Sequence, residues 1–374
     1  MAEDIFGLVL PKYGMVMTEG LISVWHVEEG ADVTEGDEIV DIETEKVANS
    51  YESPKTGVLR RKLVSAGQSL PVGGLFGVIA DADLEDARID AYVEAFNAEF
   101  AATQSHESAE GPEIVIVPSG YVRFLKKGEG SGWPVVLVHG FAGDLNSWLL
   151  NQDALGESRT VYALDLPGHG GSAAPPALDS IDDLARTIEE FLDAQGLTKV
   201  HLVGHSLGGG ITAKVALNRP QQVASLTLIA PIGLGAEINS GFIEGILTAD
   251  RRAEMKTVLE RLFHDAALVS RDMIKDVLQS KRIDGAVEAL RQIAERCTGT
   301  QHQVTRVRET LSTVSSPVQV IWGRSDQIIP CEHAAKLPEQ IAVHRIEEAG
   351  HMVHMERPGE INRLITRFVT EHDR

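Results

Sequence analysis

The chain has 374 residues, of which 43% are hydrophobic and 24% charged, which is ordinary for a globular protein of two or three domains. Its 34 basic residues stand against 55 acidic ones, giving a net charge of −21. A field of that sign repels nucleic acid and anionic lipid, so we expect neither as a partner.

The sequence carries no sign of a targeting or membrane segment. No basic region leads into a long apolar stretch at its start, and no later window is long enough to span a bilayer. We therefore expect a cytoplasmic protein without membrane contact. Cys297 and Cys331 lie outside any metal-ligand spacing, so we expect no metal site and interpret both cysteines as packing residues.

Residues 1–80 consist of short, glycine-punctuated segments that alternate or are briefly apolar. We predict strands at Ile5–Leu10, Leu21–Val27, Glu38–Glu43, Val47–Glu52, Gly57–Val64 and Leu75–Ala80. Since no long helix fits, these residues predict a small all-β barrel or sandwich. Lys46 falls between two of the strands, at the tip of a hairpin where a modifying enzyme could reach its amine. By itself, such a lysine is usually only a solvated residue.

Residues 81–112 are strongly acidic and form the predicted boundary between domains. Ile89, Val93, Phe96 and Phe100 recur at helical spacing, which predicts an amphipathic helix docked on a neighbour. We expect the remainder, residues 101–112, to be a flexible linker.

Residues 113–374 alternate between strand and helix patterns, which predicts a mostly parallel sheet covered on both faces. The expected strands are a hairpin of Ile114–Pro118 and Tyr121–Lys126, then Val135–Val138, Thr160–Leu164, Val200–Val203, Ala224–Ile229, Pro317–Trp322 and Val343–Ile346. Between about residues 233 and 315 the strand pattern vanishes, and we expect a helical lid that includes Arg251–Phe263 and Ser270–Gln279. A closing helix is expected at Pro358–His372.

An apolar segment runs into a glycine-flanked turn at Gly204-His205-Ser206-Leu207-Gly208, before a helical pattern. This arrangement predicts a nucleophile elbow, in which a strained turn between strand and helix holds a serine hydroxyl clear of the backbone. Because a serine hydroxyl is a poor nucleophile without a base, Ser206 predicts a histidine and an acid elsewhere in the chain.

The base and the acid are expected after the last two strands. His351 follows the final one in Ala349-Gly350-His351, and Asp326 follows the one before it. The order Ser206, Asp326, His351 is that of an α/β-hydrolase triad, in which the acid orients the imidazole and the imidazole moves the proton. Two alternatives stay open: His354 as the base, and Asp165 as the acid, although a turn role suits Asp165 better.

An oxyanion formed at Ser206 needs backbone donors. Leu207 supplies one N–H by its position directly after the nucleophile, and Phe141 of His139-Gly140-Phe141 is the expected second donor. We interpret His139, His169 and His205 as packing or supporting residues.

Residues 1–80 resemble lipoyl carrier domains throughout. The resemblance lies in Leu10-Pro11-Lys12, Met17-Thr18-Glu19-Gly20, Glu28-Glu29-Gly30, Gly36-Asp37, Glu43-Thr44-Glu45-Lys46, Ser53-Pro54-Lys55-Thr56-Gly57 and Leu70-Pro71-Val72-Gly73. Such domains are lipoylated at the position of Lys46, so the resemblance implies covalent lipoate there. Biotin carriers share the fold but usually set the lysine between methionines, whereas Glu45 and Val47 flank it here, which favours lipoate.

Residues 113–374 resemble α/β-hydrolases through the HGF, GHSLGG, GRSD and AGH motifs just described. Together the two halves resemble the acyltransferase components of acetoin dehydrogenase complexes. This resemblance implies transfer of an acetyl group from S-acetyl-dihydrolipoyl-Lys46 to coenzyme A. It also implies three partners: a thiamine-diphosphate-dependent acetoin dehydrogenase component, dihydrolipoamide dehydrogenase and a lipoate ligase. The trimer-forming fold and the peripheral-subunit-binding domain of ordinary 2-oxoacid dehydrogenase acyltransferases are not recognisable.

Two other functions stay open: a serine hydrolase or thioesterase fused to a carrier, and a non-catalytic scaffold that presents a lipoyl group. The complete set of triad residues speaks against a scaffold. Transferase and hydrolase would both form acyl-Ser206 and differ only in whether a thiol or water resolves it, so the sequence does not separate them.

Overall fold

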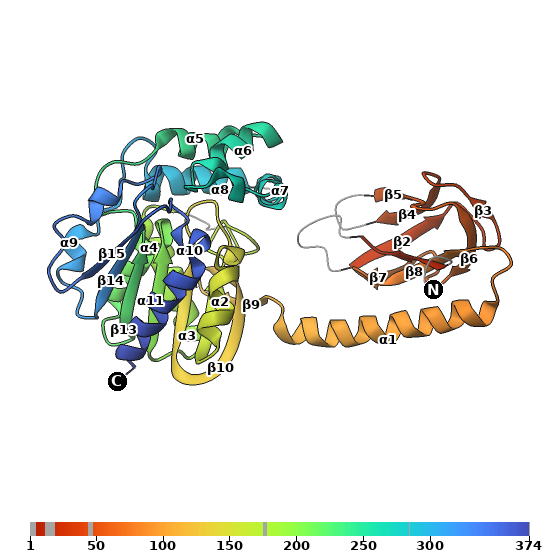
Figure 1. The fold of residues 1–374 in the computed structure, drawn as a ribbon, viewed down its shortest axis with the longest axis horizontal. Helices are drawn as coiled ribbons and strands as arrows, with labels where there is room; N and C mark the ends of the chain where they lie inside the picture. The colour runs from red at the N-terminus through yellow and green to blue at the C-terminus, as the bar shows by residue number, and fades with distance from the viewer. Residues whose placement is uncertain (1–4, 12–18, 44–47, 175–177, 284, 374) are drawn as a thin grey trace. The chain divides into compact units, whose positions relative to one another are not determined.

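In the computed structural model, residues 5–11, 19–43, 48–174, 178–283 and 285–373 are described (Figure 1). The chain divides into two compact units, Met1–Ala109 and Glu110–Arg374, each with its own hydrophobic core.

The first unit is a sandwich of two four-stranded sheets, ordered β1-β8-β6-β3 and β5-β4-β2-β7. Its strands are β1 (Ile5–Val9), β2 (Glu19–Trp25), β3 (Asp32–Val33), β4 (Glu38–Glu43), β5 (Ala48–Glu52), β6 (Gly57–Lys62), β7 (Gln68–Pro71) and β8 (Leu75–Ala80). Leu8, Ile22, Ile42 and Phe76 come from both sheets and are fully buried in one cluster. The predicted all-β fold is therefore confirmed. β3 and β7 were not predicted, because 2 and 4 residues are too few to show an alternating pattern.

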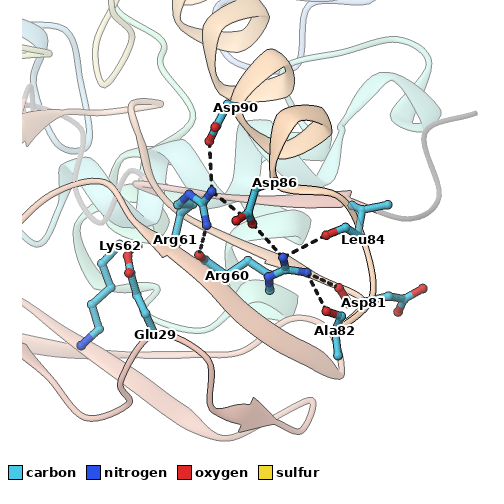
Figure 2. A network of polar contacts seen from close by, with 9 residues as sticks. All are labelled: Glu29, Arg60, Arg61, Lys62, Asp81, Ala82, Leu84, Asp86 and Asp90. Carbon is cyan, nitrogen blue, oxygen red and sulfur yellow. Dashed lines mark hydrogen bonds and ion pairs between the residues drawn. The ribbon is translucent and has the colours of Figure 1, made fainter.

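A long helix, α1 (Asp86–Glu110), follows the sandwich. Its Ile89 is fully buried and packs with Leu75 and Val78 of β8, as the amphipathic pattern predicts. Two arginines of β6 hold the start of the helix (Figure 2): Arg60 pairs with Asp86 at 2.8 Å, and Arg61 pairs with Asp90 at 3.2 Å.

The structure has helix where a flexible linker was expected. α1 continues to Glu110, so only Gly111 and Pro112 separate it from β9 (Glu113–Val117). Residues 101–110 contain three alanines and no glycine or proline. Since each added residue gains one hydrogen bond once a helix is nucleated, the docked first turns can propagate through this polar segment until Gly111-Pro112 stops them.

The second unit is built on one seven-stranded sheet, ordered β11-β10-β12-β13-β14-β15 with β9 paired to β10. Its remaining strands are β10 (Gly120–Val138), β11 (Arg159–Leu164), β12 (Val200–His205), β13 (Val223–Ile229), β14 (Val318–Gly323) and β15 (Ala342–Ile346). β12 to β15 pair in parallel with one another, and β9 pairs antiparallel with β10. The prediction of a mostly parallel sheet is thus confirmed.

β10 is one long strand that reverses direction, where two separate strands were predicted. Residues 124–127 pair with 164–161 in falling register, whereas residues 135–138 pair with 161–164 in rising register. β11 therefore lies between the two halves of β10. At the reversal the backbones approach so closely that a side chain on Gly130 would overlap the carbonyl group of Ser158.

Helices cover both faces of this sheet. α3 (Ile181–Ala194) and α4 (Leu207–Asn218) pack in the same cluster as Val136 and Val138 of β10. α2 (Leu149–Gly156) and α11 (Pro358–Glu371) pack in the cluster of Val135 and Leu137. Alternate residues of β10 thus point to opposite faces, as the pleat of a strand requires.

The segment between β13 and β14 is helical, as the loss of strand pattern predicted, and we call its residues 233–315 the lid segment. Its helices are α5 (Ser240–Thr248), α6 (Arg252–Glu260), α7 (Arg271–Ser280), α8 (Ala286–Ile293) and α9 (Arg308–Leu311). α5 to α8 gather at one end of the sheet (Figure 1). In the described parts of the chain, every helix is too short or too polar to cross a membrane.

Candidate active site

Ser206 lies in the tight turn between β12 and α4. Its φ of 52° and ψ of −113° are strained for a serine. A side chain on Gly204 would overlap the carbonyl of Gly208, and one on Gly208 would overlap the carbonyl of Val138. The two glycines therefore permit close packing of strand and helix, and the strained conformation falls on Ser206 itself, as in a nucleophile elbow.

His351 and Asp326 are brought together by the loops that follow β15 and β14. His351 Nδ1 lies 2.8 Å from Asp326 Oδ2, and both side chains are buried. Since a carboxylate only accepts, Nδ1 carries the hydrogen and Nε2 is left as the acceptor. Asp326 also accepts from Trp322 Nε1 at 2.9 Å and from the Ile328 N–H at 2.8 Å. These donors compensate the burial of its charge. Sequence reasoning missed Trp322, although it lies on the strand just before Asp326.

Ser206, His351 and Phe141 line one cavity of about 330 Å³. Ser206 and His351 follow the carboxyl ends of β12 and β15, which is the edge where a parallel sheet commonly holds its ligand. The lid segment supplies much of the remaining wall, including Phe242 and Leu290. A substrate bound here would meet a strained serine and the accepting Nε2 of His351 in the same cavity.

The two expected oxyanion donors border the same serine. Leu207 is the first residue of α4, so its N–H has no acceptor within the helix. A Cβ added to Gly140 would lie 3.0 Å from Cβ of Ser206, so the peptide that joins Gly140 to Phe141 runs directly beside the serine. This loop is held in place by the Ala142 N–H, which donates to His169 Nε2 at 3.1 Å.

Substitution of Gly140 by alanine is expected to lower kcat by about 100-fold, the effect of losing one oxyanion donor. The new Cβ would lie only 2.8 Å from His205 Nδ1, which would push the backbone of Phe141 away from Ser206. Hydrolysis of p-nitrophenyl acetate measures kcat, and thermal unfolding shows whether the variant is folded. Gly156→Ala is the matched control, since its nearest neighbour would lie at 3.6 Å. A folded Gly140→Ala variant with unchanged kcat would exclude this loop from the oxyanion site.

The hydrogen-bond partners of Asp165 are those expected of a structural carboxylate. Asp165 is fully buried and accepts from Arg123 Nη1, the Leu145 N–H and the Gly171 N–H, each at 2.8 Å. These bonds tie the loop that follows β11 to strand β10 and to the short 3-10 helix that begins at Leu145, which agrees with the turn role that its sequence context favours.

His354 lies outside the described lining of the cavity, between the rings of Trp148 and His205 at centroid distances of 4.6 and 4.7 Å. Burial, and after it the neighbouring His351, lowers the pKa of His354 to about 3. His205 donates from Nε2 to the His351 carbonyl at 3.0 Å, so it supports the backbone of that residue. Of the two candidate bases, His351 alone has the carboxylate partner and the place in the cavity.

Glu356 joins the lid segment to the loop of His351. Its Oε1 accepts from the His264 N–H at 2.8 Å, and its Oε2 accepts from the Gly350 N–H at 2.5 Å. His264 follows α6, and Gly350 directly precedes His351. Sequence reasoning missed this contact because His264 and Glu356 are 92 positions apart. Movement of this part of the lid segment would therefore strain the backbone that holds His351.

Lys46 falls in residues 44–47, outside the described residues. These four residues connect β4 to β5, and the last described pair across the hairpin is Glu43↔Ala48. Glu43 is exposed, so the described end of the hairpin faces solvent.

Residues 134–358 match the family model described as alpha/beta hydrolase fold, and residues 7–79 match the one described as biotin-requiring enzyme. Among solved structures, a meta-cleavage product hydrolase has 24% sequence identity and a TM-score of 0.61, covering 69% of this chain and 98% of its own. That likeness shows the fold of the second unit.

Two curated relatives match the chain from end to end. Each is described as a dihydrolipoyllysine-residue acetyltransferase component of an acetoin cleaving system. The one from Cupriavidus necator is 42% identical over 99% of this chain and 98% of its own length. The one from Pseudomonas putida is 43% identical over 99% of this chain and 100% of its own length. The chain joins a domain of the biotin and lipoyl carrier type to a domain with the α/β-hydrolase fold. It therefore belongs to the family of dihydrolipoyllysine-residue acetyltransferase components of acetoin cleaving systems.

Proposed function

We propose that this protein transfers an acetyl group from a lipoyl arm on Lys46 to coenzyme A through an acetyl-Ser206 intermediate. The observation that carries the proposal is the buried His351–Asp326 hydrogen bond, whose histidine lines the same cavity as the strained Ser206. The descriptions of the two relatives and the presence of a carrier-type unit in the same chain support it.

Lys46 is the residue that would hold the lipoyl group. Its place between β4 and β5 fits attachment, because the described residues on either side form a hairpin with an exposed end. A lipoyl group supplies a thiol that carries an acetyl group as a thioester. We propose a thiamine-diphosphate-dependent acetoin dehydrogenase component as the enzyme that loads it, with dihydrolipoamide dehydrogenase and a lipoate ligase as further partners.

In the first half-reaction, Ser206 Oγ attacks the thioester carbonyl while His351 Nε2 accepts its proton. Asp326 stabilises the imidazolium that forms and keeps its ring oriented. The N–H groups of Phe141 and Leu207 donate to the oxyanion. The carbon–sulfur bond then breaks, and His351 gives its proton to the departing thiol, which leaves acetyl-Ser206.

In the second half-reaction, His351 takes the proton of the coenzyme A thiol, and the sulfur attacks acetyl-Ser206. The bond from carbon to Oγ breaks, and His351 returns the proton to Ser206. Exchange between two thioesters is nearly balanced in free energy, so the protein has to lower barriers rather than supply a driving force. For transfer to prevail, the coenzyme A thiol has to react with acetyl-Ser206 faster than water does.

One observation favours hydrolysis as the second candidate function. Among the described residues that line the cavity there is no lysine or arginine. The neutral pantetheine arm of coenzyme A suits such walls, but its phosphates must stay outside them. Water as the acceptor would need no cation at all.

The product of the reaction separates the two functions. Purified protein is mixed with S-acetyl-dihydrolipoamide, with and without coenzyme A, and acetyl-CoA and acetate are quantified. We expect acetyl-CoA to exceed acetate when coenzyme A is present. Acetate release at the same rate with and without coenzyme A would identify a hydrolase instead.

The variant Lys46→Arg is the matched control for the carrier. It should lose the lipoyl adduct seen by intact mass in cells that contain a lipoate ligase. It should nevertheless keep its activity on free S-acetyl-dihydrolipoamide, since Ser206, His351 and Asp326 lie in the other unit. A wild-type protein from such cells without any adduct would refute the carrier role.

A further inference from the structure

The cavity beside Ser206 is much larger than an acetyl group needs. It measures about 330 Å³. An engineered protein cavity of about 150 Å³ is enough to bind benzene, which has six carbon atoms. On that scale the cavity holds about thirteen non-hydrogen atoms, whereas an acetyl group has three.

The walls of the cavity are apolar and largely contributed by the lid segment. Besides Phe141, the buried apolar side chains that line it are Phe242, Ile243, Ile246, Leu259, Phe263, Leu290 and Ile328. The carboxyl groups among the described lining residues are Asp144 and Asp276, and burial raises the pKa of Asp144. The described lining contains no lysine or arginine that could pair with a negatively charged ligand. The walls therefore favour a neutral, apolar chain.

The exposed lining residues mark where the cavity opens. Tyr121 at the start of β10 is 44% exposed and Ile283 after α7 is 37% exposed, and Asp276, Asn146 and Ala174 are exposed as well. A chain that stays tethered to a carrier has to run out through this mouth. These seven apolar side chains are buried, so they line the closed part of the cavity. In a tethered substrate only the end of the acyl group that carries no tether can fill that part.

We propose a further activity for this site: Ser206 accepts unbranched acyl groups of about six to ten carbons and hydrolyses their esters. The inference rests on the proposed acylation of Ser206 and names a wider class of acyl group. The acyl–oxygen bond of the ester breaks as the bond from the acyl carbon to Oγ forms, and the serine proton passes through His351 to the departing alcohol. Water then adds its hydroxyl to the acyl carbon and its other proton to Ser206 by way of His351.

A series of p-nitrophenyl esters with acyl chains of two, four, eight and twelve carbons tests the proposal on the full-length protein. Burial of each added methylene in an apolar wall is worth about a fourfold gain in kcat/KM. Octanoate has six more methylenes than acetate, so we expect kcat/KM to rise by about three to four orders of magnitude between the two esters, and to fall at twelve carbons, when the cavity is full. A flat series, or one that is highest at acetate, would overturn the proposal.

Wall variants identify the cavity as the cause. Ile246→Phe should shorten the chain length that gives the highest kcat/KM, and Ile246→Ala should lengthen it. Leu290→Phe and Leu290→Ala repeat the test on a different helix in case one position does not tolerate change. Shifts in opposite directions cannot come from loss of stability, whereas shifts in the same direction would contradict the wall assignment.

The two proposals fail in different ways. If octanoate esters are preferred and respond to the wall variants but no acetyl-CoA is formed from S-acetyl-dihydrolipoamide, the acetyl transfer proposed above is wrong and the wider acyl specificity stands. If acetyl-CoA is formed but acetate is the best ester, the wider specificity alone is wrong.

Discussion

Replacement of Ser206 by alanine is expected to lower kcat for acetyl transfer by about 10⁴- to 10⁶-fold, as removal of the nucleophile does in serine enzymes with a triad. The substitution deletes the attacking oxygen while leaving the His351–Asp326 pair and the cavity in place. The rate is measured as acetyl-CoA formed from S-acetyl-dihydrolipoamide. Intact mass after mixing with the acetyl donor alone should show an acetyl adduct on the wild type and none on the variant.

Ser312→Ala is the matched control for this experiment. The Ser312 hydroxyl is exposed and donates to the nearby Glu309 carbonyl, so its loss should leave the transfer rate unchanged. Full transfer activity in Ser206→Ala would mean that the coenzyme A thiol attacks the thioester directly. The protein would then act by orienting two substrates, without a covalent intermediate.

Replacement of Asp326 by asparagine is expected to lower kcat by about 10⁴-fold, the loss seen when a triad carboxylate becomes an amide. Both oxygens of Asp326 accept hydrogen bonds: Oδ2 from His351 and Trp322, and Oδ1 from the Ile328 N–H. An amide offers one acceptor and one donor, so in either orientation its NH₂ group faces another donor. His351 would then lose the tautomer that leaves Nε2 free to accept the serine proton. Steady-state kinetics on S-acetyl-dihydrolipoamide measure this loss.

Asp165→Asn is the comparison that decides between the two candidate acids. The side chain of Asp165 is as deeply buried as that of Asp326 and also accepts several hydrogen bonds, but those bonds come from Arg123 and backbone amides. We expect this variant to unfold at a lower temperature while its folded fraction keeps a kcat within about tenfold of the wild type, since no reacting group is removed. A loss of kcat in Asp165→Asn that matched Asp326→Asn would reopen the choice of acid.

The sequence by itself determined those features that depend on residues close together in the chain. The nucleophile turn could be predicted because Gly204, Ser206 and Gly208 lie in one short segment, where backbone sterics depend on neighbouring residues. The strand that precedes the turn and the helix that follows it could be predicted from periodicity over a few residues. Asp326 and His351 could be named because their order along the chain and their positions after strands are characteristic, although nothing in the sequence measures the 2.8 Å between them.

The tertiary structure decided what depends on residues far apart in the chain. The reversal of β10, with β11 between its halves, is a matter of pairing register that no local pattern contains. The extension of α1 beyond residue 100 follows from a helix nucleated by docking on the sandwich. The donors that compensate the buried Asp326 and the contact of Glu356 with the lid segment appear only when distant loops meet. The size of the cavity is likewise set by the packing of α5 to α8 over the sheet, because an enclosed volume is a property of the assembled elements and not of any one segment.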